Sequence, residues 1–124
     1  MVSKLLKRNG DKFYFVFRVL IGLLFFLHGW MKVTGIMDGK IAFLSLMGLA
    51  AFVEVVGGIF IVVGFLTRPV AAICGIQMVF AYFMAHASGG LSPLANKGEP
   101  AVLFFVAFLV LAAHGAGRWG LDNE

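Results

Sequence analysis

The sequence predicts an all-α integral membrane protein that folds as a four-helix antiparallel bundle. Of its 124 residues, 61% are hydrophobic and only 13% are charged, and the mean hydropathy is +0.99. This composition leaves too little polar surface for a water-soluble domain. Four long apolar segments, close to the ~20 residues needed to cross a bilayer, are separated by connectors that contain glycine and proline. We expect one domain over residues 1–124.

The first apolar segment follows a basic tail and predicts a helix over residues 13–33. It shows no small-residue cleavage site, so we expect it to be retained and not removed as a signal peptide. Five residues recur along it at spacings of four and three: Arg18, Gly22, Phe25, Gly29 and Lys32. These spacings place them on one stripe of a helix. Because small residues mark where a neighbouring helix approaches closely, the stripe should face the interior of the bundle.

The second segment predicts a helix over residues 43–66 and carries a single carboxylate, Glu54. Ala51, Gly57 and Gly58 share its face at offsets of three and four. An ionised carboxylate inside a bilayer costs several kcal/mol unless a partner or a proton neutralises it. We therefore expect Glu54 to be buried against a partner on another helix.

The third and fourth helices are expected over residues 69–87 and 99–117. The short connection Thr67-Arg68-Pro69 makes the second and third helices antiparallel neighbours, and Pro69 suits a first helical turn. Gln77 and His86 lie nine residues apart, on opposite faces of the third helix, and the sequence does not say which one points inward. The single cysteine, Cys74, is interpreted as a small buried apolar residue.

Four crossings would put both termini on one side of the membrane. Without Arg18, that side has six basic residues, Lys4, Lys7, Arg8, Lys12, Arg68 and Arg118, and the other side has three, Lys32, Lys40 and Lys97. This bias predicts cytoplasmic termini. Arg18 lies inside the first helix near that face, and we expect its side chain to snorkel toward the head groups.

Helical rise sorts the remaining polar residues by depth. Glu54 lies fourteen residues from Arg68, and Lys32 lies fourteen from Arg18, about 21 Å at 1.5 Å per residue. The outer half of the bundle then collects His28, Lys32, Glu54, His86 and Glu99, and the inner end collects Arg18, Arg68, His114 and Arg118. We expect Lys32 to pair with Glu54, and Glu99 to lie at the mouth of the same pocket.

Several short motifs occur in a characteristic order: Arg18-x3-Gly22, Gly29-x2-Lys32, Glu54-x3-Gly58, Gly64-x3-Arg68, Asn96-x2-Glu99 and the ending Gly115-x-Gly117 before Leu121-Asp122. In these the chain resembles the DoxX family of small four-helix membrane proteins. The resemblance implies a bacterial or archaeal cytoplasmic (inner) membrane protein linked to quinone-dependent oxidoreduction, as in the membrane part of a thiosulfate:quinone oxidoreductase, or to oxidative and thiol stress. It also implies protein partners, as other subunits or as a homo-oligomer.

The Lys32–Glu54 pair has two interpretations that the sequence leaves open. It is either a buried ion pair that fixes helix register or part of a pocket for a quinone head group. In the pocket, Lys32, His28 and His86 would donate hydrogen bonds, and Glu54 or Glu99 would relay protons. We predict no metal, because no Glu-x2-His or His-x3-His pair is present and Lys32 would repel a cation.

Three functions remain from these observations. The first is a redox-associated subunit that binds quinone and receives electrons from a partner protein. The second is a structural or anchoring subunit of a larger complex, and the third is a small transporter or channel. Nucleic-acid binding is excluded because the basic residues form no patch.

Overall fold

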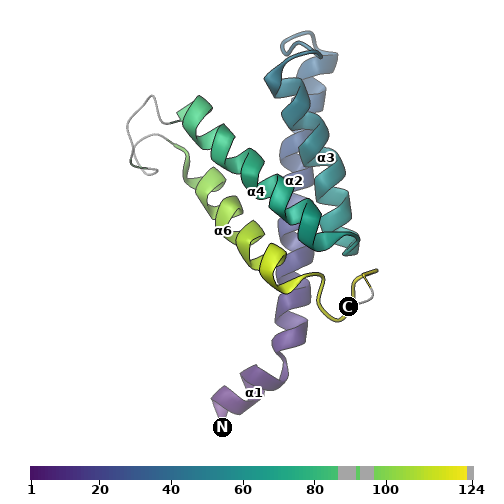
Figure 1. Ribbon diagram of the computed structural model, residues 1–124, viewed down its shortest axis with the longest axis vertical. Coiled ribbons are helices and arrows are strands. Elements are labelled where there is room, and N and C mark those ends of the chain that lie inside the picture. The colour runs from purple at the N-terminus through teal and green to yellow at the C-terminus, as the bar shows by residue number, and fades with distance from the viewer. Residues whose placement is uncertain (87–91, 93–96, 123–124) are drawn as a thin grey trace.

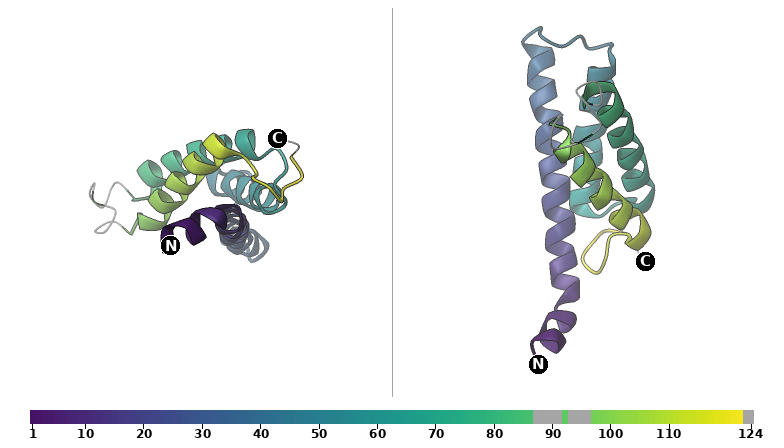
Figure 2. Two further views of the ribbon diagram at one scale, coloured as in Figure 1. Left: turned by 90° about the horizontal axis from the view of Figure 1, so that it is seen from below. Right: turned by 90° about the vertical axis from the view of Figure 1, so that its left-hand side faces the viewer.

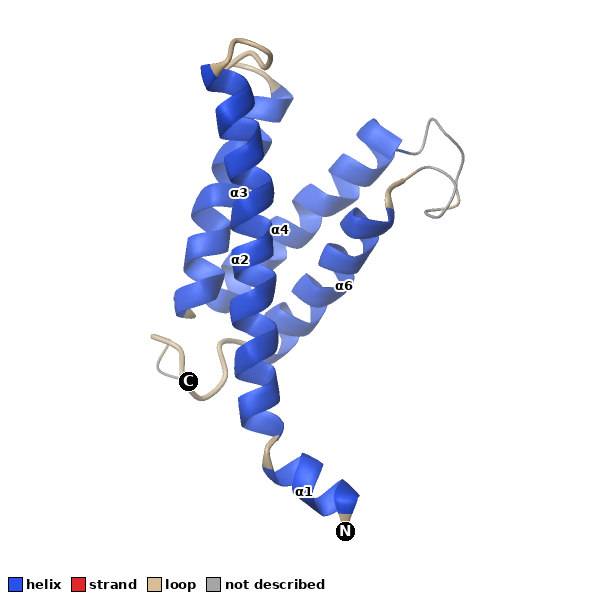
Figure 3. Ribbon diagram, turned by 180° about the vertical axis from the view of Figure 1, so that it is seen from behind, coloured by secondary structure: helices blue, strands red, loops and turns tan. Residues whose placement is uncertain are grey.

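The structure is a computed structural model that describes residues 1–86, 92 and 97–122, and every regular element in these ranges is a helix (Figures 1 and 3). The elements are α1 (Val2–Arg8), α2 (Gly10–Met37), α3 (Leu46–Val63), α4 (Thr67–Ala81), the π-helix η1 (Tyr82–His86) and α6 (Glu99–His114). Gly10–Met37, Leu46–Val63 and Thr67–Met84 are long and apolar enough to cross a membrane, whereas Glu99–His114 is shorter. The all-helical prediction is confirmed.

The helices are arranged as two antiparallel pairs. Helix α2 runs beside α3, and α4 runs beside α6 and crosses the first pair obliquely (Figures 1 and 2). The pairs meet toward the end of the molecule that carries both chain termini and diverge toward the opposite end (Figure 1). We call these the inner end and the outer half, as in the topology expected from the sequence. A single regular four-helix bundle stays a prediction.

Glycines allow the backbones of α2 and α3 to approach closely. A Cβ atom on Gly58 would lie 2.7 Å from the carbonyl oxygen of Gly22, and one on Gly29 would lie 2.7 Å from the backbone nitrogen of Val55. Neither backbone atom can move aside as a flexible side chain could. The prediction that these glycines mark a helix contact is therefore confirmed.

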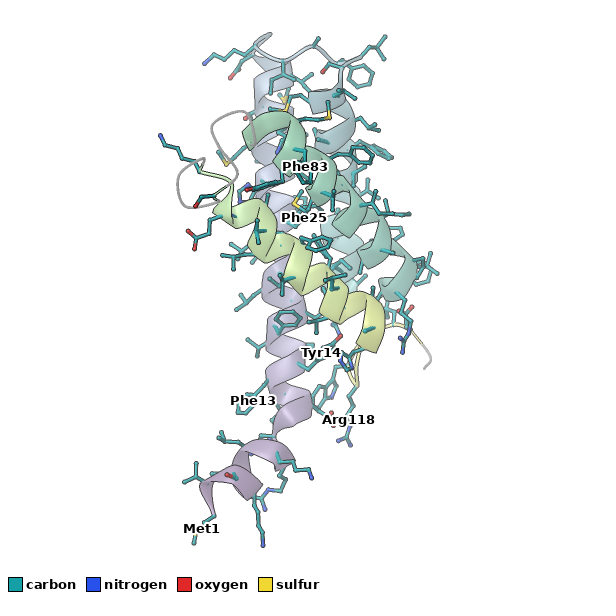
Figure 4. The ribbon with its side chains drawn as sticks, turned by 60° about the vertical axis from the view of Figure 1, so that its left-hand side comes forward. Met1, Phe13, Tyr14, Phe25, Phe83 and Arg118 are labelled. Carbon is teal, nitrogen blue, oxygen red and sulfur yellow. The ribbon has the colours of Figure 1, made fainter. Side chains whose placement is uncertain are left out.

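An aromatic cluster fills the crossing between the two pairs. Phe25 of α2 contacts Phe104 and Phe108 of α6, with ring centroids 5.4 Å and 4.7 Å apart. Figure 4 shows Phe25 behind the ribbons of α4 and α6. Aromatic pairs in such geometries contribute about 0.5–1.5 kcal/mol beyond the burial of their surface, so this cluster helps to hold the second pair of helices against the first.

The helix ends differ from those predicted. Helix α2 continues to Met37, beyond the expected residue 33, and α3 stops at Val63 because Gly64 adopts a left-handed conformation (φ 70°). The Phe65 N–H donates to the Phe60 carbonyl at 3.0 Å, which completes a Schellman ending. Helix α4 begins at Thr67 with Pro69 in its first turn, where proline removes no helical hydrogen bond.

The C-terminal ends of the last two segments also differ. The third helix changes from α to π geometry after Ala81, and most of the connector expected after it lies outside the described residues. Helix α6 ends at His114, not at 117, because Gly115 takes φ 77° and ψ −158°, a conformation that a side chain would strain.

Candidate functional site

Glu54 of α3 is buried, with 2% of its surface exposed. Its Oε1 atom lies 2.9 Å from Nζ of Lys32 on α2. The glycine stripe explains this pairing, because the close approach at Gly29 brings the backbone of α2 against the Cβ atom of Glu54. The expected ion pair between Lys32 and Glu54 is present, and it joins the two helices of the first pair.

Gln77 of α4 supplies the second partner of Glu54. Its side-chain Nε2 donates to Oε2 of Glu54 at 2.9 Å, so both carboxylate oxygens are engaged. The sequence left open whether Gln77 or His86 points inward, and Gln77 does. Its own Oε1 atom is buried and has no hydrogen-bond partner among the described residues. A buried unpaired acceptor of this kind costs about 1–3 kcal/mol.

A cavity of about 310 Å³ lies beside the ion pair. Lys32, Glu54 and His28 form its polar side, and Phe25 and Phe104 form part of its apolar wall. Lys32 is only partly covered, with 23% of its side chain exposed. The carboxylate is thus fixed by two helices and still borders open space, an arrangement that can bind a small molecule with hydrogen-bonding groups.

The other predicted residues of the outer half are placed differently. Glu99 is exposed in the first turn of α6 and does not line the Glu54 cavity. It lines a neighbouring cavity, which also contains His28. The side chain of His86 lies outside the described part of the chain. In that part, no three His, Cys, Asp or Glu residues are grouped as metal ligands would be.

Arg18 forms the second buried charged centre, at the inner end. It is 1% exposed and donates to the carbonyls of Ile61 (3.0 Å) and Val62 (3.1 Å) in the last turn of α3. It also donates to the carbonyls of Ala116 and Trp119 in the C-terminal segment. The snorkelling prediction is therefore wrong. The helix end and the C-terminal segment offer enough carbonyls to satisfy the guanidinium inside the protein.

Asp122 is an inner-end residue that the sequence analysis missed. Helix α4 has no side-chain cap of its own, and Leu66 before it has φ 50°. The Asp122 carboxylate accepts from the N–H groups of Leu66 (2.7 Å) and Thr67 (2.9 Å). Burial pushes the pKa of Asp122 upward, but these backbone hydrogen bonds and the nearby Arg18 charge outweigh it and lower the pKa below its ordinary value. The Leu121-Asp122 ending is the only signal in the sequence, and it does not reveal a capping role.

The remaining inner-end residues lie at the surface. Arg68 donates to the carbonyls of Ala112 (3.3 Å) and Ala113 at the C-terminal end of α6, where a cation is favoured by the helix dipole. His114 is exposed beside the Tyr14 ring. Arg118 is exposed, 3.6 Å from Asp11. Tyr14 lies beside the segment that follows α6 and carries Arg118 (Figure 4), and its hydroxyl donates to the Gly115 carbonyl at 2.6 Å.

The fold and the two buried charges define a small helical membrane protein, and comparison with known proteins identifies the class. The chain belongs to the DoxX family, whose model matches residues 13–87, more than half of its length.

Three relatives match over most of their lengths. A protein of Haemophilus influenzae without a functional name is 34% identical, with 96% of this chain and 95% of the relative covered. CatD of Bacillus subtilis, whose name provisionally calls it an oxidoreductase, is 29% identical over 85% of this chain and 81% of its own. The inner membrane protein YqjF of Escherichia coli is 28% identical, with 95% of both chains covered. No solved structure matches the chain.

Proposed function

We propose that the protein is an inner-membrane subunit that supports quinone-linked oxidoreduction. The Glu54 cavity holds the quinone head group, and a partner protein carries the electrons. The observation that supports this most directly is the buried Glu54 carboxylate, tied to Lys32 and Gln77, at the edge of a cavity. The provisional name of CatD points in the same direction.

The cavity favours binding over a purely structural ion pair. A pair that only fixes helix register gains from being enclosed, because an unfilled space beside it loses packing contacts. Here Lys32 stays partly exposed and His28 and Lys97 also line the space. Three groups that can donate hydrogen bonds therefore surround one void, which suits a ligand with carbonyl acceptors.

The residues present fit a quinone head group. Lys32 and His28 can donate to its carbonyl oxygens, and Phe25 and Phe104 offer apolar ring surfaces for its flat face. The volume of about 310 Å³ falls at the lower end of the range typical of ligand pockets. A bound quinone would accept two electrons and two protons in becoming a quinol.

Within that reaction the chain would position the ligand and handle protons. The Lys32 ammonium would orient a carbonyl oxygen and stabilise negative charge that develops on it. Glu54, in contact with Lys32, would pass one proton to that oxygen, and the second proton of the quinol would reach the other oxygen through another group that lines the cavity. The chain has one cysteine and no dithiol, so the two electrons come from the redox centre of the partner protein.

The proposed topology places both termini in the cytoplasm and the Glu54 cavity in the outer half of the membrane. The termini lie at one end of the structure (Figure 1), and that end carries most of the basic residues. Two Escherichia coli relatives, YqjF and YphA, are named as inner membrane proteins. Helix α6, with 16 residues, would complete four crossings.

Binding of a quinone to the purified protein tests the function. The wild-type protein should retain quinone through purification and bind added quinone, whereas Lys32→Met with Glu54→Gln should bind at least about tenfold more weakly. This double change replaces the pair with neutral groups of similar volume, so the fold should persist. Lys40→Met, at an exposed position after α2, is the matched control. A wild type that binds no quinone would refute the function.

Labelling from outside intact cells tests the topology. In a Cys74→Ser background, a cysteine introduced as Ser92→Cys should react with an impermeant reagent, and one introduced as Ser3→Cys should not. Both positions are exposed in the structure. The reverse pattern would invert the proposed topology.

A further inference from the structure

A second cavity, of about 390 Å³, lies between α2 and α6 next to the Glu54 cavity. Ile21 and Leu24 of α2 and Leu103 and Phe104 of α6 form its apolar wall. We call this cavity the α2–α6 groove. Leu24 and Leu103 are exposed, so the groove opens toward lipid when these helices cross a bilayer. It shares His28, Pro100 and Phe104 with the Glu54 cavity.

We propose that the α2–α6 groove receives the hydrocarbon tail of the ligand whose head occupies the Glu54 cavity, so that this ligand enters from the lipid. This inference rests on the proposed function and adds the route and the chemical class of the ligand: an amphiphile with a carbonyl-bearing head and one long apolar tail. Its support is that the Glu54 cavity, with its polar side, and the apolar groove lie next to each other and share three lining residues.

The direction of the groove suits such a tail. Along α2, Leu24 lies four residues and Ile21 seven residues from His28, toward the inner end, which corresponds to about 6 Å and 10 Å of helical rise. Along α6, Leu103 lies four residues beyond Glu99 in the same direction. The polar groups therefore sit at the outer rim, and the apolar wall descends toward the middle of the bilayer.

His28 and Phe104 mark the junction between the two cavities. Their rings lie edge to face, with centroids 5.4 Å apart, and both residues line both spaces. A ligand that spans the junction would contact this ring pair where its head joins its tail. A water-soluble substrate would have no use for the apolar part of the groove.

The tail gains little free energy from the groove itself, because lipid chains are as apolar as leucine. The groove instead provides the space that the tail must occupy while the head is bound, so filling it should exclude a tailed ligand by volume. A ligand with the same head and no tail does not need this space and should still reach Lys32 and Glu54.

Tryptophan substitutions test the route. Leu24→Trp and Leu103→Trp would fill the groove from two different helices. Leu23→Trp and Leu109→Trp are matched controls, because these leucines are also exposed and line neither cavity. Each full-length variant is placed in nanodiscs of one lipid composition. Its affinity is then measured for two quinones with an identical head, one with an isoprenoid tail and one without a tail.

We expect each groove variant to bind the tailed quinone at least about tenfold more weakly and the tailless quinone within about twofold of wild type, while the controls bind both normally. Unchanged binding of the tailed quinone would overturn the groove inference and leave the Glu54 head site standing. Equal weakening of both quinones would also overturn it, because no effect would depend on the tail. If the wild type binds neither, the proposed function fails and the groove inference fails with it.

Discussion

Arg18 and Glu54 are both buried charges on glycine-lined helix faces, yet their surroundings differ. The Arg18 side chain donates hydrogen bonds to four backbone carbonyls, two in α3 and two in the segment after α6. Glu54 is held by two side chains, and one of them, Lys32, is partly exposed at a cavity. The first centre bonds only to backbone carbonyls, whereas the second bonds to two side chains at the edge of a cavity.

The difference suggests how to separate structural from functional charges in a small membrane protein. A charge whose bonds all go to backbone carbonyls contributes to folding, because it joins the segments that carry these carbonyls, here the last turn of α3 and the segment after α6. A charge that borders a cavity keeps part of its bonding capacity for a ligand. Loss of Arg18 should therefore unfold the protein, and neutralisation of the Glu54 pair should mainly abolish binding.

The largest effect is expected from Arg18→Met. This change removes four hydrogen bonds from a cationic side chain to α3 and to the segment after α6. Hydrogen bonds to charged groups contribute about 1.5–3 kcal/mol each, so we expect a loss of roughly 4 kcal/mol or failure to fold. Thermal unfolding in detergent, followed by circular dichroism, measures it. Arg18→Lys should restore only part of the stability, because an ammonium cannot span four acceptors as the guanidinium does. If Arg18→Met is as stable as the wild type, the Arg18 centre does not stabilise the fold and does not differ from the Glu54 centre in the way we infer.

A smaller loss is expected from Lys32→Met alone. Breaking a buried ion pair on one side costs roughly 3–5 kcal/mol, and the partial exposure of Lys32 should reduce this to about 3 kcal/mol. Adding Glu54→Gln should recover most of it, since no buried charge is then left unpaired. The double-mutant cycle gives the coupling energy. If Lys32→Met with Glu54→Gln is no more stable than Lys32→Met alone, the stability does not depend on an unpaired Glu54 charge. The pair then contributes more to the fold than we infer.

Gly58→Ala tests whether the contact between α2 and α3 positions both centres. Its Cβ atom would meet backbone atoms at 2.7 Å, and overpacking of this kind costs about 2 kcal/mol. Gly75→Ala is the matched control, since its nearest neighbour, the Cβ atom of Phe108, is 3.5 Å away. The control should be neutral or slightly stabilising, because alanine favours helix over glycine by about 1 kcal/mol. Equal unfolding temperatures in the two variants would contradict this packing.

The smallest effect is expected from Asp122→Ala. The loss of a cap for α4 should cost about 1 kcal/mol at neutral pH. Because folding lowers the pKa of Asp122, its contribution is present above the ordinary aspartate pKa of about 3.9. The contribution is lost as pH falls through the lower folded value. The difference between wild type and variant should thus shrink in unfolding scans below about pH 4. If the difference in stability between wild type and Asp122→Ala does not change with pH, the effect comes from packing and not from the charge of Asp122.

The sequence predicted the features that follow from periodicity. The glycine stripe and the single carboxylate in an apolar helix were enough to place Glu54 against Lys32, because burial of a charge in lipid demands a partner. For the polar residue of the third helix that points inward, the sequence left two candidates, Gln77 and His86. The choice between them depends on how the helix is rotated about its own axis, which periodicity does not fix. Periodicity does not tell which side chain bonds to the backbone groups of a distant segment. The carbonyl partners of Arg18 and the capping role of Asp122 therefore could not be predicted.

The segment after α6 has a consequence for biosynthesis. Leu121 and Asp122 donate backbone hydrogen bonds to Val63 and Gly64, and the Asp122 side chain bonds to the first turn of α4. These residues leave the ribosome after every described helix has been made. Chains are synthesised at about 5–20 residues per second, so α3 and α4 wait several seconds in the membrane with open ends. A nascent chain arrested before Ala116 would lack two of the four carbonyls that accept hydrogen bonds from Arg18.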